Sequence, residues 1–382
     1  MTDTERRDFW WNTVTGPHAV VLDASAALRD GYAVALKGGR RAVWAAEMRS
    51  AVEYTFKEHM STEGVLMHVV NGDKCHTADD VGRWLLETFA SPRQRAGYRS
   101  RSKTSQQEYL LKNEILQHRL IWVQLDDRDA ASAWQSFVRA YPSRNSSSGL
   151  FVLEMDADAP CEDGQRIRSI DVLERISTND LTLLNTFVLA SRYGYSTAWR
   201  EYVSTLAASV CYPDAALSAE MVEAADLRGR TVLDILELLE SRHAAEDFAD
   251  DHVLSLLRRG RSDEIEHRIW RAQIQTLFPR IEMERVDIIN EWRGNVDRGL
   301  HEVRLEQFGE RVERPEDMEL GLLWYCTTHW KPDGDYIVYL PDRYVRDRIR
   351  FLHLCRNKLA HRCAVDGEEL VELLDGAGFV RE

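Results

Sequence analysis

The first half of the chain alternates between helical and extended hydrophobic patterns. Apolar residues recur at helical spacing over residues 16–31, and the short apolar run of residues 32–39 follows them. The alternation continues to about residue 176. The predicted strands cover residues 32–39, 64–72, 118–127, 149–158 and 165–176, and the predicted helices cover residues 16–31, 42–60, 78–90 and 129–141. Short apolar runs separated by helices are typical of a parallel sheet covered on both faces, so we expect an α/β domain with a sheet of about five strands flanked by helices.

The second half has an almost purely helical pattern. From Thr178 onward the segments "LTLLNTFVLASRYG" and "TVLDILELLESRH" show helical periodicity, and only "DYIVYL" (335–340) indicates a further short strand. The sequence therefore predicts an α/β region followed by an all-α region. We divide it into an α/β domain over 1–177, a helical middle region over 178–261 and a helical domain over 262–382.

Composition narrows the classes of ligand. The chain has 382 residues, of which 44% are hydrophobic and 29% charged, and a formal net charge of -14. This acidic excess opposes general attraction to nucleic acid or anionic membranes, so a nucleic-acid contact would have to be local. The absence of any apolar run of 18 residues or of a signal-peptide pattern predicts a cytoplasmic protein that makes no membrane contact.

The cysteine and histidine pattern does not indicate a metal site. Six cysteines occur without a CxxC pair, which argues against a disulfide framework or a zinc ribbon. The nearest approach to a ligand set is Cys326 and His329 together with His353 and Cys355, in two segments that both appear helical. We expect neither a metal nor a cofactor.

A glycine-rich, cationic turn follows the first predicted strand. It reads "LKGGRRAVW" and contains Lys37, Gly38, Gly39, Arg40 and Arg41. Two glycines and three cations before a helix could receive an anion, which makes these residues the candidate nucleotide- or phosphate-binding site. The G-x-x-x-x-G-K-[ST] motif is absent, so the turn has no Ser or Thr hydroxyl to bind Mg²⁺.

Acidic residues follow two later strands, in "LDD" (Asp126, Asp127) and "LEMD" (Glu154, Asp156). An α/β domain of this order followed by helices resembles the P-loop ATPases of the AAA and STAND types, in which a Walker B acid lies at such a position. Because phosphoryl transfer depends on the missing phosphate loop, the resemblance implies a degenerate NTPase-like domain with a structural role. Other parallel-sheet folds, flavodoxin-like or nuclease-like, fit the same order of elements.

A basic stretch interrupts the α/β pattern between Ser91 and Lys103. It contains no acid, and its cations surround one tyrosine. Cations can hold phosphates and a tyrosine can stack on a base, so this stretch is a candidate nucleic-acid-binding site; a solvated loop is the alternative. The candidate residues are Arg93, Arg95, Tyr98, Arg99, Arg101 and Lys103.

The last long helical pattern contains "RNKLAH", with Arg356, Asn357 and His361. This motif resembles the R-x4-H motif of HEPN domains, which are helical bundles that dimerise. The resemblance implies that Arg356, Asn357 and His361 are candidate catalytic residues for metal-independent RNA cleavage. An imidazole can move protons near neutral pH, and an Arg presents a planar fork to phosphate. The alternatives are RNA binding without cleavage and a structural role in which these side chains tie helices together.

The two resemblances together are typical of prokaryotic conflict and phage-defence proteins. They imply a non-catalytic or regulatory subunit of a bacterial defence or stress-response assembly, with other protein subunits as partners. RNA or a nucleotide is a further candidate ligand, and the HEPN-like domain is a candidate homodimer interface. The main alternative is a HEPN-type endoribonuclease that uses Arg356 and His361. A nucleotide-responsive switch would instead require phosphate binding at "LKGGRR".

Overall fold

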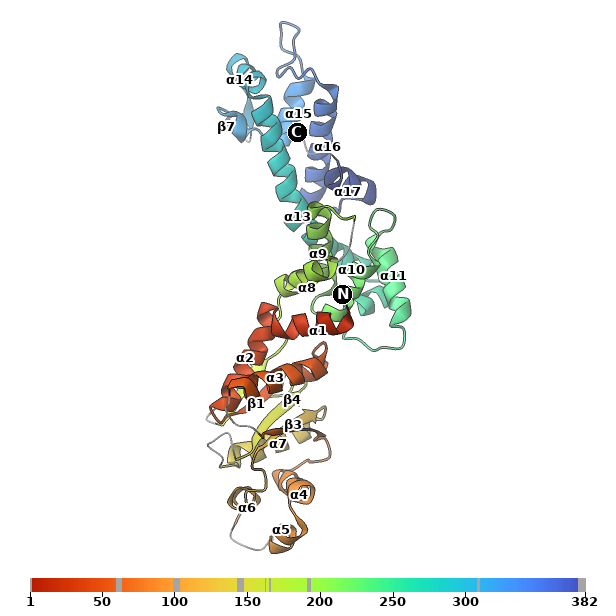
Figure 1. Ribbon diagram of the computed structural model, residues 1–382. Helices are drawn as coiled ribbons and strands as arrows, with labels where there is room; N and C mark the ends of the chain where they lie inside the picture. Colours follow the sequence, from red (N-terminus) through yellow and green to blue (C-terminus); the bar gives the residue numbers. More distant parts are fainter. Residues whose placement is uncertain are drawn as a thin grey trace. The chain divides into compact units, whose positions relative to one another are not determined.

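The computed structural model describes residues 2–59, 64–98, 104–142, 148–161, 163–164, 166–190, 194–307 and 310–376 (Figure 1). Contacts within the chain divide it into two compact units, Met1–Leu184 and Asn185–Glu382. The division falls inside helix α8 (Thr178–Ala190), 13 residues after the last sheet strand ends at Asp171. The division of the chain into three parts stays a prediction.

A five-stranded parallel sheet forms the centre of the first unit. Its strands are β1 (Ala33–Lys37), β2 (Leu66–Asn71), β3 (Arg119–Leu125), β4 (Leu150–Met155) and β5 (Ile167–Asp171). They lie in the order β2-β3-β4-β1-β5, so β1 pairs with both β4 and β5. The prediction of an α/β unit with a parallel sheet of about five strands is confirmed.

Helices cover both faces of this sheet (Figure 1). Helices α2 (Thr15–Arg29) and α3 (Ala45–His59) lie on one face, and α4 (Ala78–Phe89) and α7 (Arg128–Ala140) lie on the other. Ala35, Val123 and Leu153 belong to the same buried cluster as Trp134 and Phe137 of α7. Because β4 is buried along its whole length, its sequence is an almost unbroken apolar run, as expected for a central parallel strand.

Three short helices of the first unit lie in segments that the hydrophobic pattern left unassigned. Helix α1 (Asp3–Asn12) begins with a capping box between Thr2 and Glu5 and buries two tryptophans, and α5 (Pro92–Gly97) and α6 (Gln106–Lys112) also begin with capping boxes. Their pattern was too short or too polar for periodicity to detect. A 3₁₀ turn, η1 (Gly39–Arg41), connects β1 to the segment before α3.

Helices dominate the second unit. They are α9 (Thr197–Cys211), α10 (Ala215–Ala224), α11 (Val232–Arg242), α12 (Val253–Arg258), α13 (Ser262–Glu291), α14 (Arg293–Glu302), α15 (Leu320–Thr328), α16 (Arg343–Ala360) and α17 (Gly367–Leu374). A two-stranded hairpin of β6 (Glu306–Gln307) and β7 (Glu310–Arg311) and a 3₁₀ turn η2 (Pro315–Asp317) interrupt them. The 30-residue helix α13 packs against α9 and α16, and α15 also packs against α16.

The strand predicted over residues 335–340 does not form. The structure has an isolated bridge between Trp330 and Tyr336 at this place. Ile337 and Val338 are buried, and the Val338 amide donates to the Cys326 carbonyl at 2.9 Å. The apolar run therefore reflects a loop that is fixed to the end of α15, because a short apolar run alone does not distinguish a strand from a buried loop.

Within the described part of the chain, none of the helices is both long enough and apolar enough to span a bilayer.

Candidate functional site

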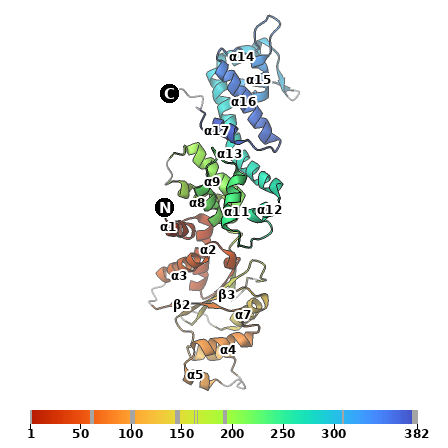
Figure 2. The same ribbon diagram turned by 90° about the vertical axis from the view of Figure 1, so that its right-hand side faces the viewer.

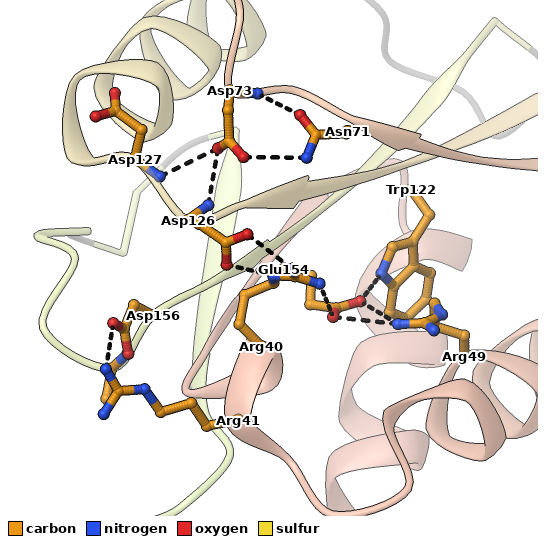
Figure 3. Close-up of polar contacts among 11 residues, drawn as sticks. Arg40, Arg41, Arg49, Asn71, Asp73, Trp122, Asp126, Asp127, Glu154 and Asp156 are labelled. Carbon is orange, nitrogen blue, oxygen red and sulfur yellow. Dashed lines mark hydrogen bonds and ion pairs between the residues drawn. The ribbon is translucent and has the colours of Figure 1, made fainter. Parts of the chain in front are cut away.

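The carboxyl ends of β1, β3 and β4 carry a network of arginines and carboxylates (Figure 3). In open α/β sheets this edge is where ligands bind. Arg40 and Arg41 come from η1, and Arg49 comes from α3. The structure places Asp126 directly after β3 and Glu154 near the end of β4, so three segments that are distant in sequence meet at one edge.

Glu154 is the centre of the network. Its side chain is fully buried, and Arg49 donates to its two carboxylate oxygens at 2.9 and 3.1 Å. The indole of Trp122 donates a short hydrogen bond to the same carboxylate, and Arg40 lies at 3.5 Å from it. A buried carboxylate requires such partners, because desolvation penalises its charge. Glu154 therefore holds Arg40 and Arg49 at the sheet edge.

Arg40 forms the most regular ion pair of the site. Its Nε and Nη2 atoms donate to the two oxygens of Asp126 at 2.7 and 2.8 Å, which is a bidentate pair. The hydrogen bonds from Arg40 lower the pKa of Asp126 below its usual value. Arg41 pairs with Asp156 at 3.1 Å in a more exposed position. The Arg40 and Arg41 guanidinium groups predicted to bind phosphate thus each face a carboxylate of the protein.

The glycine turn itself is closely packed. Gly38 has φ +75°, a left-handed conformation that favours glycine, and a Cβ atom on Gly39 would lie 3.1 Å from the Cγ of Glu154. The chain then forms η1, and α3 begins only at Ala45. The predicted residues Lys37 to Arg41 do lie together at a strand-to-helix turn. However, the long helix does not start at this turn, so its N-terminus does not follow the glycines directly as a phosphate-binding helix would.

Lys37 is also paired inside the unit. Its ammonium group lies 3.5 Å from Asp171 at the end of β5. A phosphate-binding Lys must reach beyond its turn toward the ligand. Its nearest charge partner here is instead a carboxylate of the neighbouring strand.

Asp73 holds the turn after β3 in place. One of its carboxylate oxygens accepts the backbone amides of Asp126 and Asp127 at 2.8 and 3.1 Å, and the other accepts from Asn71 at 3.1 Å (Figure 3). Asp127 in turn caps α7 by accepting from the amide of Ala130. Asp127 thus serves as a helix cap. Asp73 was not predicted as a site residue, although "NGD" at the end of a predicted strand is a signal for a turn-forming carboxylate.

The two cysteines and two histidines that come nearest to a metal-binding pattern in the sequence do not form a metal site in the structure. Cys326 and Cys355 are buried, and burial raises the pKa of each thiol to about 12. His329 stacks on Tyr325, and His353 lies 3.1 Å from the amide nitrogen of Asn357. In the ranges that the structure describes, no group of three or more His, Cys, Asp or Glu side chains is placed to hold a metal ion.

The "RNKLAH" motif lies at the carboxyl end of α16. Arg356 pairs with Glu319 at 3.0 Å, and Asn357 is hydrogen-bonded to His353. His361 is the C-cap residue of α16, and its side chain is exposed. Burial and the charge of Arg356 lower the pKa of His353 below the usual histidine value. A structural role of the motif would require His361 to bond Asn357 or a neighbouring helix. The histidine that bonds Asn357 is instead His353.

The basic stretch is only partly described. Arg93 and Arg95 are exposed on α5, and Tyr98 is half-buried with its ring edge-on to Tyr109 at 5.2 Å. Arg99, Arg101 and Lys103 lie outside the described residues. Tyr98 also packs against the buried cluster of the first unit, which leaves less of its ring accessible to a base.

Comparison of the chain with protein-family models, curated proteins and solved structures gives no match, so its function is inferred from the geometry described above.

Proposed function

We propose that this chain is a non-catalytic subunit of a multi-protein assembly, in which the α/β unit serves as a structural module and does not hydrolyse nucleotides. The observation that supports this most directly is the pairing of Arg40, Arg41 and Arg49 with carboxylates of the same unit. In a phosphate site these cations would be available to the ligand. Here each of them is already neutralised by a neighbouring acid.

Charge balance at the edge argues against a polyphosphate. The three arginines face Asp126, Glu154 and Asp156, and Asp73 and Asp127 add negative charge beside them. A bound polyphosphate would have to displace these carboxylates from their guanidinium partners. Glu154 is fully buried and would remain as an uncompensated charge, which is strongly unfavourable.

The kind of assembly is proposed from the two sequence resemblances. An NTPase-like sheet followed by a helical region with "RNKLAH" supports the proposal that the assembly belongs to a bacterial defence or stress-response system. Its partners would be other protein subunits.

We expect that the purified protein neither binds nor hydrolyses Mg²⁺-ATP or Mg²⁺-GTP. Calorimetric titration should give only heats of dilution, and phosphate release should equal that of buffer. Lys37→Ala should behave like the wild type, because Lys37 faces Asp171. Hydrolysis by the wild type that disappears in Lys37→Ala would contradict the proposal.

A charge-neutralising variant tests whether the carboxylates prevent nucleotide binding or whether the site has no affinity for nucleotides even without them. Asp126→Asn combined with Asp156→Asn keeps the side-chain shapes but removes the counter-charge of Arg41 and the bidentate counter-charge of Arg40. This variant should give a saturable binding heat with ATP in the same calorimetry, whereas the wild type gives only heats of dilution. Equal absence of binding in both proteins would show that the carboxylates are not what excludes the nucleotide.

A second candidate function is RNA cleavage at the end of α16. The observation that favours it is the exposed imidazole of His361 in the same motif as Arg356, whose side chain is 27% exposed. Against it stand the ion pair of Arg356 with Glu319 and the bond of Asn357 to His353. Two of the three motif residues therefore already have partners within the protein.

We expect His361→Ala to change the free energy of unfolding by no more than about 0.5 kcal/mol, because the side chain is exposed. Arg356→Ala should cost about 1 kcal/mol or less, the usual range for a partly exposed ion pair. Thermal melting and incubation with a fluorescent single-stranded RNA measure both properties, with His329→Ala as the control for an exposed imidazole of the same unit. We expect no RNA cleavage by the wild type. Cleavage that both motif variants lose and the control keeps would establish the ribonuclease.

A further inference from the structure

The sheet of the first unit has one open edge, at β2 (Figure 2). The backbone amide of Leu66 donates to the carbonyl of His118, and that of Gly72 donates to the carbonyl of Gln124, both at 2.9 Å. The even-numbered residues of this segment therefore direct their backbone amides and carbonyls toward β3. Because backbone groups alternate along a strand, those of Met67, Val69 and Asn71 point outward. Among the described residues no hydrogen bond satisfies these outward groups.

The opposite edge, at β5, is covered. Ala33 donates to the Arg166 carbonyl and Val172 to that of Lys37, so the odd-numbered residues of β5 point away from β1. The amide of Ser169 donates to the Asp163 carboxylate at 3.0 Å, and the Ile167 carbonyl accepts from Gly164 at 3.0 Å. A short loop therefore caps β5, whereas β2 has no such cover in the described part of the unit.

The sequence of β2 also lacks the features that usually prevent edge pairing. "LMHVVN" contains no Lys, no Asp or Glu and no proline, and its pairing with β3 runs without a bulge. Leu66 is 59% exposed and Val69 is 45% exposed. Native proteins normally protect such an edge with charges, proline, bulges or a covering segment, so an open and uncharged edge strand indicates a pairing partner.

We propose that two copies of this chain associate through their β2 strands, which pair antiparallel about a two-fold axis to form one continuous sheet. A strand is the protein element that pairs with a whole row of outward amides and carbonyls, and a second copy supplies an identical strand. The absence of charge on β2 means that no like charges meet across the pair. Because β5 is capped, pairing stops at two copies and does not propagate into a fibre.

The direction of the backbone groups defines the register. Outward-facing residues form the hydrogen-bonded pairs of an antiparallel ladder, so each outward residue must lie opposite another outward residue. An axis at Val69 places Met67 opposite Asn71 and gives partners to all the outward groups of β2. An axis at any other residue of β2 would place at least one outward residue opposite a residue outside the strand. Val69 of one copy therefore lies opposite Val69 of the other.

A cysteine cross-link tests this register on the full chain. The exposed native Cys363 is first changed to serine in all variants, including the reference protein. Residues opposite each other in a hydrogen-bonded antiparallel pair have Cα atoms about 5.5 Å apart, and this separation suits a disulfide. Val69→Cys should cross-link to a dimer under mild oxidation. Val70→Cys, which lies opposite His68, should remain uncross-linked.

Sedimentation of the reference protein and of Val69→Lys tests the association itself. The reference protein should sediment as a dimer at micromolar concentration. The like charges of Val69→Lys should weaken the association at least tenfold while the far-ultraviolet circular dichroism spectrum stays unchanged, because the side chain is exposed. A monomeric reference protein, a dimer that is insensitive to Val69→Lys, or equal cross-linking of the two cysteine variants would each overturn the proposal. The outcome is independent of the nucleotide and RNA experiments.

Discussion

Replacing Glu154 by alanine should lower the free energy of unfolding of the first unit by about 3 to 5 kcal/mol, the cost of breaking a buried ion pair by removing one partner. The carboxylate is fully buried and accepts from Arg49 and Trp122. Without it, the buried indole of Trp122 and the largely buried guanidinium of Arg49 lose their acceptor. Urea unfolding followed by far-ultraviolet circular dichroism measures the loss.

Asp156→Ala is the matched control for Glu154→Ala. Asp156 also pairs with an arginine at the same sheet edge, but the Arg41 side chain is 65% exposed. Exposed ion pairs contribute about 0 to 1 kcal/mol. Equal losses for the two variants would show that burial of Glu154 does not dominate the energetics of the network.

Arg348→Ala should have a comparable effect on the second unit, about 3 to 5 kcal/mol. The Arg348 side chain is 2% exposed and donates to both oxygens of Glu284 at 2.6 and 2.9 Å. It also donates to the side chain and the carbonyl of Glu372 at 2.8 and 3.1 Å. The substitution leaves Glu284 as a buried carboxylate without its counter-charge. Thermal and urea unfolding of the full chain measure the change.

Two variants distinguish loss of this ion pair from a general effect on α16. Arg343→Ala, on the same helix with an 86% exposed side chain, should change stability by no more than about 0.5 kcal/mol. Replacing Arg348 and Glu284 together by methionine should recover most of the stability, because an apolar pair leaves no buried charge. A double variant as unstable as Arg348→Ala would show that packing, not the unpaired charge, causes the loss.

Hydrophobic pattern was sufficient to predict the sheet because its central strands are buried on both faces. Residues 118–127 and 149–158 appear as apolar runs, and the structure forms β3 and β4 within them. The pattern could not show that 335–340 is a loop, since buried loop residues are apolar as well. It also could not show that β2 lies at an edge, because its apolar run resembles that of a central strand.

The sequence predicted only some features of the candidate site. The cations after β1 and the acids after β3 and β4 are each evident beside a predicted strand. Their pairing is not, because Arg40 is 86 residues from Asp126 and 114 from Glu154. Arg49 was missed since it belongs to an amphipathic helix whose polar positions look solvated.

By itself the sequence determined the sheet strands, the long helices and the chemical types present at the strand ends, because these follow from local periodicity and turn chemistry. Only the tertiary structure decided which partners those residues have. The strand order brings Arg40 beside Asp126 and Glu154, which converts a candidate anion site into a neutralised network. In the same way, helix packing places Arg356 in an ion pair with Glu319 and leaves the side chain of His361 exposed. Charges that are distant along the chain compensate each other only after folding, so no local pattern could reveal which of them remain available to a ligand.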